Sequence, residues 1–263
     1  MKIQAVEVAE ATMKRTFTLN LSTCLVAVAI VGAGPHTLHA QGQPPPDHPA
    51  ITIRGQTYTP RSILARNMGT PEDQSTAFPP HKIIGNIYYV GTRTLTSFLV
   101  TTPQGAILIN STYERNVPVI QKSVEQLGFK FSDIKIVLGN HAHGDHQEGD
   151  ALVKQLTGAQ VMAMAEDAGK TYDVMFGCSL RAPEKLTPQH VDEFNRSFAL
   201  VRALPCDVQL GDHGAQYNMQ AKYAKLRSGG PNPFIDPDSC KLEAEISETM
   251  FRAILAEQGG RQP

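Results

Sequence analysis

The amino-acid sequence predicts an α/β fold, in which short buried strands alternate with amphipathic helices. Apolar runs rich in β-branched residues at 83–90, 94–100, 106–109 and 134–138 have the length and composition of strands. Residues 117–127 repeat apolar side chains with helical spacing. The chain is 41% hydrophobic and 19% charged, as a globular protein is, and its formal charge of −1 indicates no nucleic-acid partner.

The first 40 residues have the organisation of a secretory signal peptide. Basic residues at 14–15 precede an apolar stretch over 19–31 that is too short to span a bilayer. Small residues then lead to a candidate cleavage site after Ala40. Met13 competes with Met1 as the first residue, and an uncleaved membrane anchor is the alternative to a signal peptide. Once the signal is removed, we expect no membrane partner.

The remainder divides into an extended, proline-rich N-terminal leader over 41–81 and one folded domain over 82–263. Export implies an oxidising compartment, the periplasm, in which cysteines pair. Among the cysteines of the mature chain we favour a bridge between Cys206 and Cys240, with Cys178 left over. Three buried free thiols are the alternative.

The order of elements places a polar motif at the end of a buried strand. His-Ala-His-Gly-Asp-His over 141–146 follows the strand at 134–138. Farther along we expect a short helix at 151–156, strands at 159–164, 170–177 and 206–211, a helix from Thr187 to 204, and helices at 217–226 and 236–257. Loops at strand ends are where layered α/β folds collect catalytic groups, so we expect the functional site there.

The side chains of this motif suit zinc and, to a lesser degree, iron or manganese. His141 and His143 are two positions apart, so they leave an extended segment on the same face and can share one metal ion. Asp145 and His146 turn in another direction and would serve a second ion together with His213, which lies in a glycine-flanked turn. Two zinc ions support metal-assisted hydrolysis, in which Asp145 orients the nucleophile. A polar loop rich in histidine is the alternative.

The HAHGDH motif and the later GDHG resemble the metallo-β-lactamase superfamily. Together with NIYYVGTRTLTSFLVTTPQGAILIN, RSFALVRALPCDVQLGDHG and GGPNPFIDP, they are similar to the third subclass of exported metallo-β-lactamases over most of 82–258. The resemblance implies a four-layer αβ/βα sandwich with two zinc ions between its sheets and a Cys206–Cys240 disulfide. It also implies a periplasmic monomer that hydrolyses small β-lactam antibiotics, and hence antibiotic resistance.

Matched residue by residue, the resemblance also implies roles for single side chains. His141 and His143 correspond to ligands of the first zinc, and Asp145, His146 and His213 to ligands of the second. Ser179 lies where the family places serines that face the substrate. Arg181 replaces a second serine, and its guanidinium can pair with the carboxylate of the drug.

One part of the family pattern is missing. The family carries a segment with a Gly-His-Thr turn, whose histidine completes the first zinc site, between strands that end near Met164 and begin near Lys170. Here residues 165–169 join those strands directly. On the order of fifty to sixty residues are therefore absent, a length that forms two or three strands with their connections. No histidine lies between His146 and His190. We therefore expect an internal deletion, a sandwich incomplete in its second half, one well-bound zinc, one weakly bound zinc and impaired hydrolysis.

Two other functions remain open. The chain is a zinc-binding remnant without activity, or it is another hydrolase of the superfamily, a thioesterase or a lactonase. The export signal and the Cys206/Cys240 pair argue against the last reading, because those relatives are mostly cytosolic.

Overall fold

The structure is a computed structural model of the 263-residue chain, and it describes residues 3–5, 49–141, 143–164 and 186–259. These residues belong to one compact unit, formed by Met1–Val6 and Asp47–Pro263. The expected strand at 170–177 lies outside the described residues.

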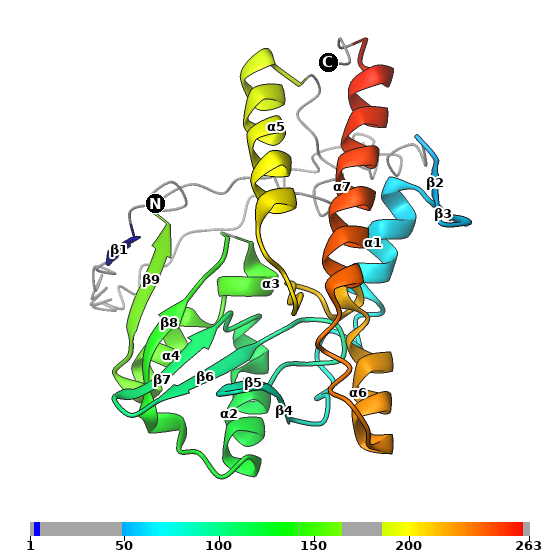
Figure 1. Cartoon of the computed structure of the whole chain (residues 1–263). Coiled ribbons are helices and arrows are strands. Elements are labelled where there is room, and N and C mark those ends of the chain that lie inside the picture. The colour runs from blue at the N-terminus through cyan, green and yellow to red at the C-terminus, as the bar shows by residue number, and fades with distance from the viewer. Residues whose placement is uncertain (1–2, 6–48, 142, 165–185, 260–263) are drawn as a thin grey trace, which may run out of the picture. The chain divides into compact units, whose positions relative to one another are not determined.

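A mixed sheet of seven strands is the largest sheet of the described residues (Figure 1). Its strand order is β1-β9-β8-β7-β6-β5-β4. β7, β8 and β9 pair in parallel, whereas the other neighbours pair antiparallel. The strands are β1 (Ile3–Ala5), β4 (His81–Ile84), β5 (Ile87–Tyr89), β6 (Phe98–Thr102), β7 (Gly105–Ile109), β8 (Ile134–Leu138) and β9 (Gln160–Met164).

The parallel strands are joined by helical crossovers, α2 (Val117–Gln126) after β7 and α4 (Asp150–Thr157) after β8, as parallel pairing requires. These two helices cover one face of the sheet. Leu99 and Leu108 are register partners on β6 and β7, and both are fully buried in a core with side chains of both helices. Full burial of an apolar side chain of this size stabilises the fold by roughly 1.5–3 kcal/mol. The sheet therefore has a core of its own, built around β6, β7 and β8.

The opposite face of the sheet packs against C-terminal segments. Tyr89 and Phe98 are register partners on β5 and β6, and they pack with Tyr217, Met219 and Phe234. The elements on this side are a 3₁₀ helix, η3 (Gly214–Tyr217), α6 (Met219–Ser228) and the loop that leads into α7 (Pro237–Glu257). This packing fixes the segment that follows His213 against the sheet.

The remaining elements pack on α7. A hairpin of β2 (Ile51–Ile53) and β3 (Gln56–Tyr58) shares a core with α1 (Pro60–Met68) and α7. α5 (Pro188–Ala203) runs beside α7 and packs against it through Phe198 and Phe251 (Figure 1). Two leucines of the last turns of α5 and its C-cap, Leu200 and Leu204, are 62% and 55% exposed. Beyond the β2–β3 hairpin, the described ranges contain no second sheet.

The α/β prediction is confirmed, and β7, β8, α2 and α5 lie within one residue of the expected bounds. The expected strand at 83–90 is instead a hairpin of β4 and β5. Gly85 turns the chain with φ +52°, a conformation that glycine adopts without a steric penalty. The apolar residues on both sides of this two-residue turn hid it in the sequence.

The segment 206–211 was expected to be a strand and is irregular in the structure. Its nearest regular pairing is a single bridge between Leu95 and His213. A strand needs a partner strand, and the described residues supply none along this segment.

Residues 51–68 were expected to belong to an extended leader, but they form β2, β3 and α1. Thr59 and Ser62 form a capping box at the start of α1, with Pro60 at its first turn. Strands of three residues are too short to produce a periodic pattern, which is why the sequence did not reveal them. Residues 3–5, inside the expected signal peptide, form the edge strand β1, which pairs with β9.

None of the helices in the described ranges is both long enough and apolar enough to cross a membrane.

A disulfide joins Cys206, just after α5, to Cys240 in the first turn of α7, with 6.3 Å between their Cα atoms. The bridge closes a loop with a sequence separation of 34 residues. Closing a loop of this size lowers the entropy of the unfolded chain, which raises the free energy of unfolding by about 3–4 kcal/mol.

We expect dithiothreitol to lower the free energy of unfolding by about this amount in urea titrations. The C206S/C240S double variant is the control: a further loss on adding the reductant to it would contradict the assignment.

Candidate metal centre

The motif residues lie where β7 and β8 end side by side. The Asn110 amide, just after β7, donates to the carbonyl of Leu138 at the end of β8, with an N–O distance of 3.0 Å. The loop after β8 then carries the motif into the short helix α3 (Gly144–Gln147). His213 reaches the same place from the C-terminal half, because the Gly214 amide donates to the Thr94 carbonyl at 3.0 Å.

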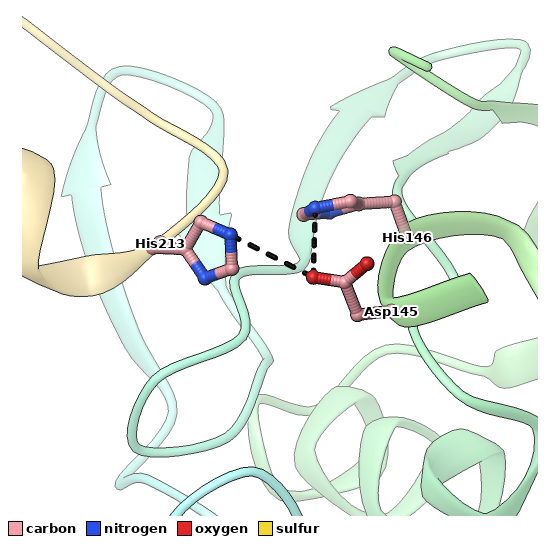
Figure 2. Close-up of side chains that lie close together, drawn as sticks. All are labelled: Asp145, His146 and His213. Carbon is pink, nitrogen blue, oxygen red and sulfur yellow. Dashed lines mark ion pairs between the residues drawn. The ribbon is translucent and has the colours of Figure 1, made fainter. Parts of the chain in front are cut away.

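Asp145, His146 and His213 converge from these segments (Figure 2). Asp145 Oδ2 lies 3.1 Å from His146 Nε2 and 3.7 Å from His213 Nε2. One donor atom from each residue lies within 4.8 Å of the others, which is a distance at which one metal ion can bind all three. Both imidazoles are about 1% exposed, so they have little contact with solvent.

His141 and His143 lie beside this group, and their ring centroids are 4.7 Å apart. The His141 ring lies 4.1 Å from that of His146. His141 is buried, and its Nε2 has no hydrogen-bond partner among the described residues. The structure therefore places His141 and His143 next to the group of Asp145, His146 and His213.

The backbone around His146 is shaped by the loop that follows β7. The amides of Ser111 and Thr112 both donate to the His146 carbonyl, at 3.0 and 3.1 Å. To reach it, Asn110 and Thr112 adopt positive φ angles of 66° and 58°. Such angles cost of order 1–3 kcal/mol for residues other than glycine and gather at functional sites. The loop thus fixes the position of His146 at the expense of local backbone strain.

Gly139 permits the close approach that this loop requires. A Cβ at this position would lie 1.8 Å from the side-chain nitrogen of Gln147 and 2.5 Å from its amide carbon. A residue with a Cβ would therefore displace the side chain of Gln147 at the end of α3.

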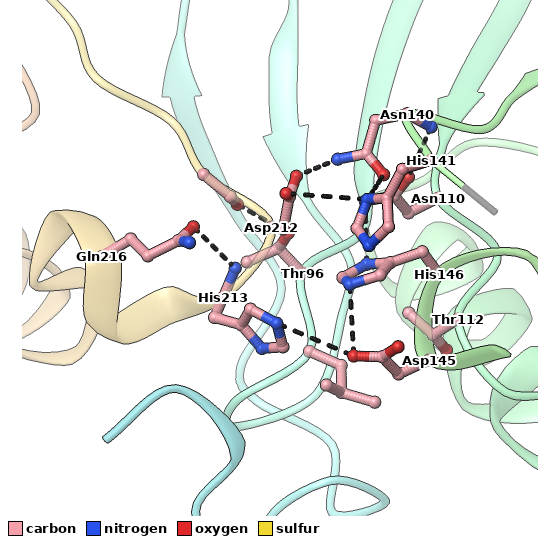
Figure 3. A network of polar contacts seen from close by, with 12 residues as sticks. Thr96, Asn110, Thr112, Asn140, His141, Asp145, His146, Asp212, His213 and Gln216 are labelled. Atoms are coloured by element: carbon pink, nitrogen blue, oxygen red, sulfur yellow. Dashed lines mark hydrogen bonds and ion pairs between the residues drawn. The ribbon is translucent and has the colours of Figure 1, made fainter. Parts of the chain in front are cut away.

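A polar network surrounds the imidazoles on the side away from Asp145 (Figure 3). Asn140 Oδ1 accepts from His141 Nδ1 at 2.9 Å, and the Asn140 amide nitrogen donates to the Asp212 carboxylate. Asn110 Oδ1 accepts from the Asn140 backbone amide at 3.3 Å. Asp212 precedes His213 in the chain, so this network connects the two loops that carry the histidines.

Burial keeps two of these imidazoles neutral. It lowers the pKa of His141 to about 3, with further lowering by the nearby His146 and His143 rings. Burial and His146 likewise lower the pKa of His213 to about 4. Neutral imidazole is the form that binds metal, so His141 and His213 are in the binding-competent state at neutral pH.

The carboxylates of the site are affected in opposite directions. Burial alone would raise the pKa of Asp145, but the hydrogen bond with His146 and the proximity of His146 and His213 outweigh it and lower the pKa to about 2. Burial raises the pKa of Asp150, behind the site, to about 6 despite its hydrogen bond from Ser111. Asp145 is therefore ionised at neutral pH, as a metal ligand must be.

These residues fit a metal ion. Three donor atoms converge, two of them imidazole nitrogens and one from an ionised carboxylate. The buried Nε2 of His141 has no hydrogen-bond partner among the described residues. Buried polar atoms are usually hydrogen-bonded, so such an atom needs an explanation, and a metal ion supplies one. Nitrogen and oxygen donors in this combination suit zinc.

Two expected site residues, Ser179 and Arg181, lie outside the described residues. Asn110, Asn140 and Asp212 support the histidines without belonging to the motif, and the sequence did not identify them. Their one signal in the sequence is position, since each lies at the end of a strand or directly beside a predicted ligand.

The lowered pKa values of His141 and His213 make the stability of the metal-free protein depend on pH. Below pH 6.5 the unfolded chain binds protons at these histidines, whereas the folded chain does not until about pH 4 or 3. We therefore expect the free energy of unfolding to fall between pH 7 and pH 5, by about 1.4 kcal/mol per pH unit for each fully differing proton. Urea titrations in the presence of a chelator measure this slope.

Asp150 acts in the opposite direction, because its raised pKa lets the folded state bind more protons between about pH 4 and 6. The D150N variant keeps an acceptor for Ser111 and removes that contribution, so its stability should fall more steeply with decreasing pH. A flat or rising stability between pH 7 and pH 5 in both proteins would contradict the neutral state of the buried histidines.

Comparison with known proteins identifies relatives among solved structures. No protein-family model matches the chain. The native FEZ-1 metallo-β-lactamase from Legionella gormanii is 32% identical, with a TM-score of 0.64, and the match covers 70% of this chain and 98% of that one. BJP-1, a subclass B3 metallo-β-lactamase of Bradyrhizobium japonicum, is 28% identical over 72% of this chain and 97% of that one, with a TM-score of 0.59. A Cronobacter sakazakii metallo-β-lactamase with a HARLDQ motif is 25% identical over 72% and 99%, with a TM-score of 0.64.

These matches extend over nearly the whole of each related enzyme and show that the chain shares their fold. The sheet is one part of the α/β sandwich expected for the family, and the coverage of 70% fits a domain that is incomplete. The chain belongs to the metallo-β-lactamases, within their third subclass, B3.

Proposed function

We propose that this chain is a zinc-dependent hydrolase that opens the amide bond of β-lactam antibiotics. The convergence of Asp145, His146 and His213 in a subclass B3 chain is the observation that carries the proposal. The FEZ-1 and BJP-1 relatives are themselves metallo-β-lactamases by name, which supports the same reaction class here.

In this proposal Asp145, His146 and His213 hold one zinc ion, and His141 and His143 hold a second. Zinc supplies a Lewis acid that polarises a carbonyl and lowers the pKa of water. Asp145 Oδ2 lies beside both imidazoles, and the carboxylate would accept a hydrogen bond from the attacking water and orient it. The burial of His146 and His213 limits competing solvent around these donors.

The two zinc positions are unequal in this proposal. Three protein donors serve one position, whereas His141 and His143 alone serve the other, because no histidine lies between His146 and His190. Catalytic zinc sites use three protein ligands, so a site with two binds far more weakly. We therefore propose that the second zinc is held weakly and that hydrolysis is impaired.

An internal deletion accounts for the missing ligand. The exposed Leu200 and Leu204 of α5 support it, since neighbouring apolar side chains of this size usually lie against another element. An alternative is that the deletion has left the chain able to bind zinc but without hydrolytic activity. Substrate binding by Ser179 and by Arg181, which would pair with the carboxylate of the drug, is part of the same proposal.

We further propose that residues 1–40 are removed as a signal peptide and that the enzyme acts as a monomer in the periplasm. The disulfide between Cys206 and Cys240 supports an oxidising compartment. Of the alternatives, a thioesterase or lactonase of the same superfamily fits these features less well.

We expect the purified, zinc-loaded chain to hydrolyse nitrocefin or a carbapenem and to lose this activity with a chelator. D145N and H213A should lower kcat/KM by at least about 100-fold, because losing a direct ligand costs more than the 10–100-fold typical of residues behind the ligands. Absorbance assays at high enzyme concentration measure the rates. D133N is the matched control, since Asp133 is exposed at the opposite end of β8 and its charge change should leave the rate unchanged.

The outcome separates the candidate functions. Zinc binding without hydrolysis of either drug would identify an inactive remnant. Hydrolysis of a thioester or a lactone at a higher rate than of the β-lactams would identify another hydrolase of the superfamily. Equal activity of D145N, D133N and the unaltered chain would exclude the proposed site.

We expect one zinc ion per chain to survive dialysis and a second to be lost. Atomic absorption after dialysis against dilute zinc measures the ratio. A chimera that receives the FEZ-1 segment after Asp167 should retain two ions and hydrolyse β-lactams faster, because it regains the third donor. Two tightly held ions in the unaltered chain, or unchanged turnover of a folded chimera, would contradict the unequal sites.

A further inference from the structure

We propose that Asp212 is a positioning residue for zinc binding, which acts through Asn140 to fix the tautomer of His141. The proposal deepens the proposed metal site, and its first test needs neither zinc nor activity. Asp212 is partly buried, 21% exposed, and its Oδ2 lies 3.9 Å from His141 Nδ1 (Figure 3).

The backbone holds Asp212 at this place. Its carbonyl accepts from the Thr96 amide at 3.1 Å, and the Thr96 hydroxyl donates to the carbonyl of the preceding Gly211 at 2.7 Å. The next residue, His213, is fixed in turn by its backbone amide, which donates to Gln216 Oε1 at 3.2 Å. The carboxylate of Asp212 therefore lies at a defined position beside the loop that follows β8.

The charge of Asp212 decides how the amide of Asn140 is oriented. A carboxylate only accepts hydrogen bonds, so it requires the NH₂ group of Asn140 and would repel the amide oxygen. The structure has this orientation, with Asn140 Nδ2 donating to Asp212 Oδ1. Asn140 Oδ1 consequently faces His141 Nδ1, at 2.9 Å.

The orientation of the amide decides in turn where His141 carries its proton. An amide oxygen only accepts, so His141 Nδ1 must be the protonated nitrogen of the neutral ring. The lone pair is then on Nε2, the buried nitrogen without a hydrogen-bond partner among the described residues. Partners behind a histidine ligand set its tautomer and raise its basicity in metal sites generally.

This arrangement bears on the weaker zinc position. His141 and His143 lack a third histidine, so the orientation and basicity of each remaining donor count for more. Asp212 adds a negative charge behind His141 although it lies 72 residues from Asn140 in the sequence. The residue thereby links the loop of one zinc position to the loop of the other.

Three variants test the proposal: D212A, D212N and N140A. Long-range ¹H–¹⁵N spectra of the metal-free protein report which nitrogen of each histidine is protonated. In D212A and N140A we expect His141 to lose its fixed Nδ1–H form, while the signals of His146 and His213 stay in place. D212N keeps an acceptor for Asn140 and should restore the His141 tautomer.

Zinc affinity, measured by competition with a chromophoric chelator, is the second readout. D212A and N140A should weaken the weaker zinc position by about 10–100-fold, the usual effect of removing a partner behind a ligand, and D212N by less. D207A is the matched control, because Asp207 is an exposed aspartate of the same segment.

Several results would overturn the proposal. One is an unchanged His141 tautomer in D212A together with an affinity within about twofold of D207A. Another is an equal loss of affinity in D212N and D212A with His141 unaffected, which would make Asp212 a direct ligand. If D212A disturbs all the histidines, N140A decides, since it leaves Asp212 and the His213 loop intact; an unchanged His141 there refutes the role. If the chain proves inactive toward β-lactams, the spectra of the metal-free variants still test the role of Asp212, because they do not depend on activity.

Discussion

The parallel pairing of β7 with β8 is the contact on which the site depends. It brings the ends of both strands to one place, so that the loop from Asn110 to Thr112 can bind the carbonyl of His146 through two backbone amides. Parallel strands have the same direction and present their carboxyl ends at one edge, which is where functional loops collect in α/β folds. The core of Leu99, Leu108 and the crossover helices stabilises this pairing independently of the site.

Gathering imidazoles and a carboxylate in a buried place is costly, and the surrounding structure offsets that cost in specific ways. The neutral state of His141 and His213 avoids the penalty of burying charge, and the nearby His146 and His213 lower the pKa of Asp145 despite its burial. Asn140 and Asp212 satisfy the outer side of His141, leaving its inner nitrogen for another partner. The charge pattern of the metal-free site is thus already that of a site prepared for a cation.

Local signals in the sequence predicted much of this arrangement. The apolar run of β8, the motif after it and the Thr187 cap of α5 are each encoded by neighbouring residues, and the structure has them within a residue or two of the expected positions. The hairpin at Gly85 and the short strands before α1 were missed, because apolar residues flank the turn and three residues show no period. The pairing of Asn140 with Asp212 depends on tertiary contact and carries no local pattern, so only the structure reveals it.

The same geometry links metal binding to stability. The site joins loops that follow β7 and β8 to the segment before η3, which is also held by backbone hydrogen bonds of Thr96 with Asp212 and of Gly214 with Thr94. A ligand that binds only the folded state stabilises it in proportion to the logarithm of its concentration over Kd. A metal ion bound by Asp145, His146 and His213 would therefore stabilise the folded state by linking the loop after β8 to the segment before η3.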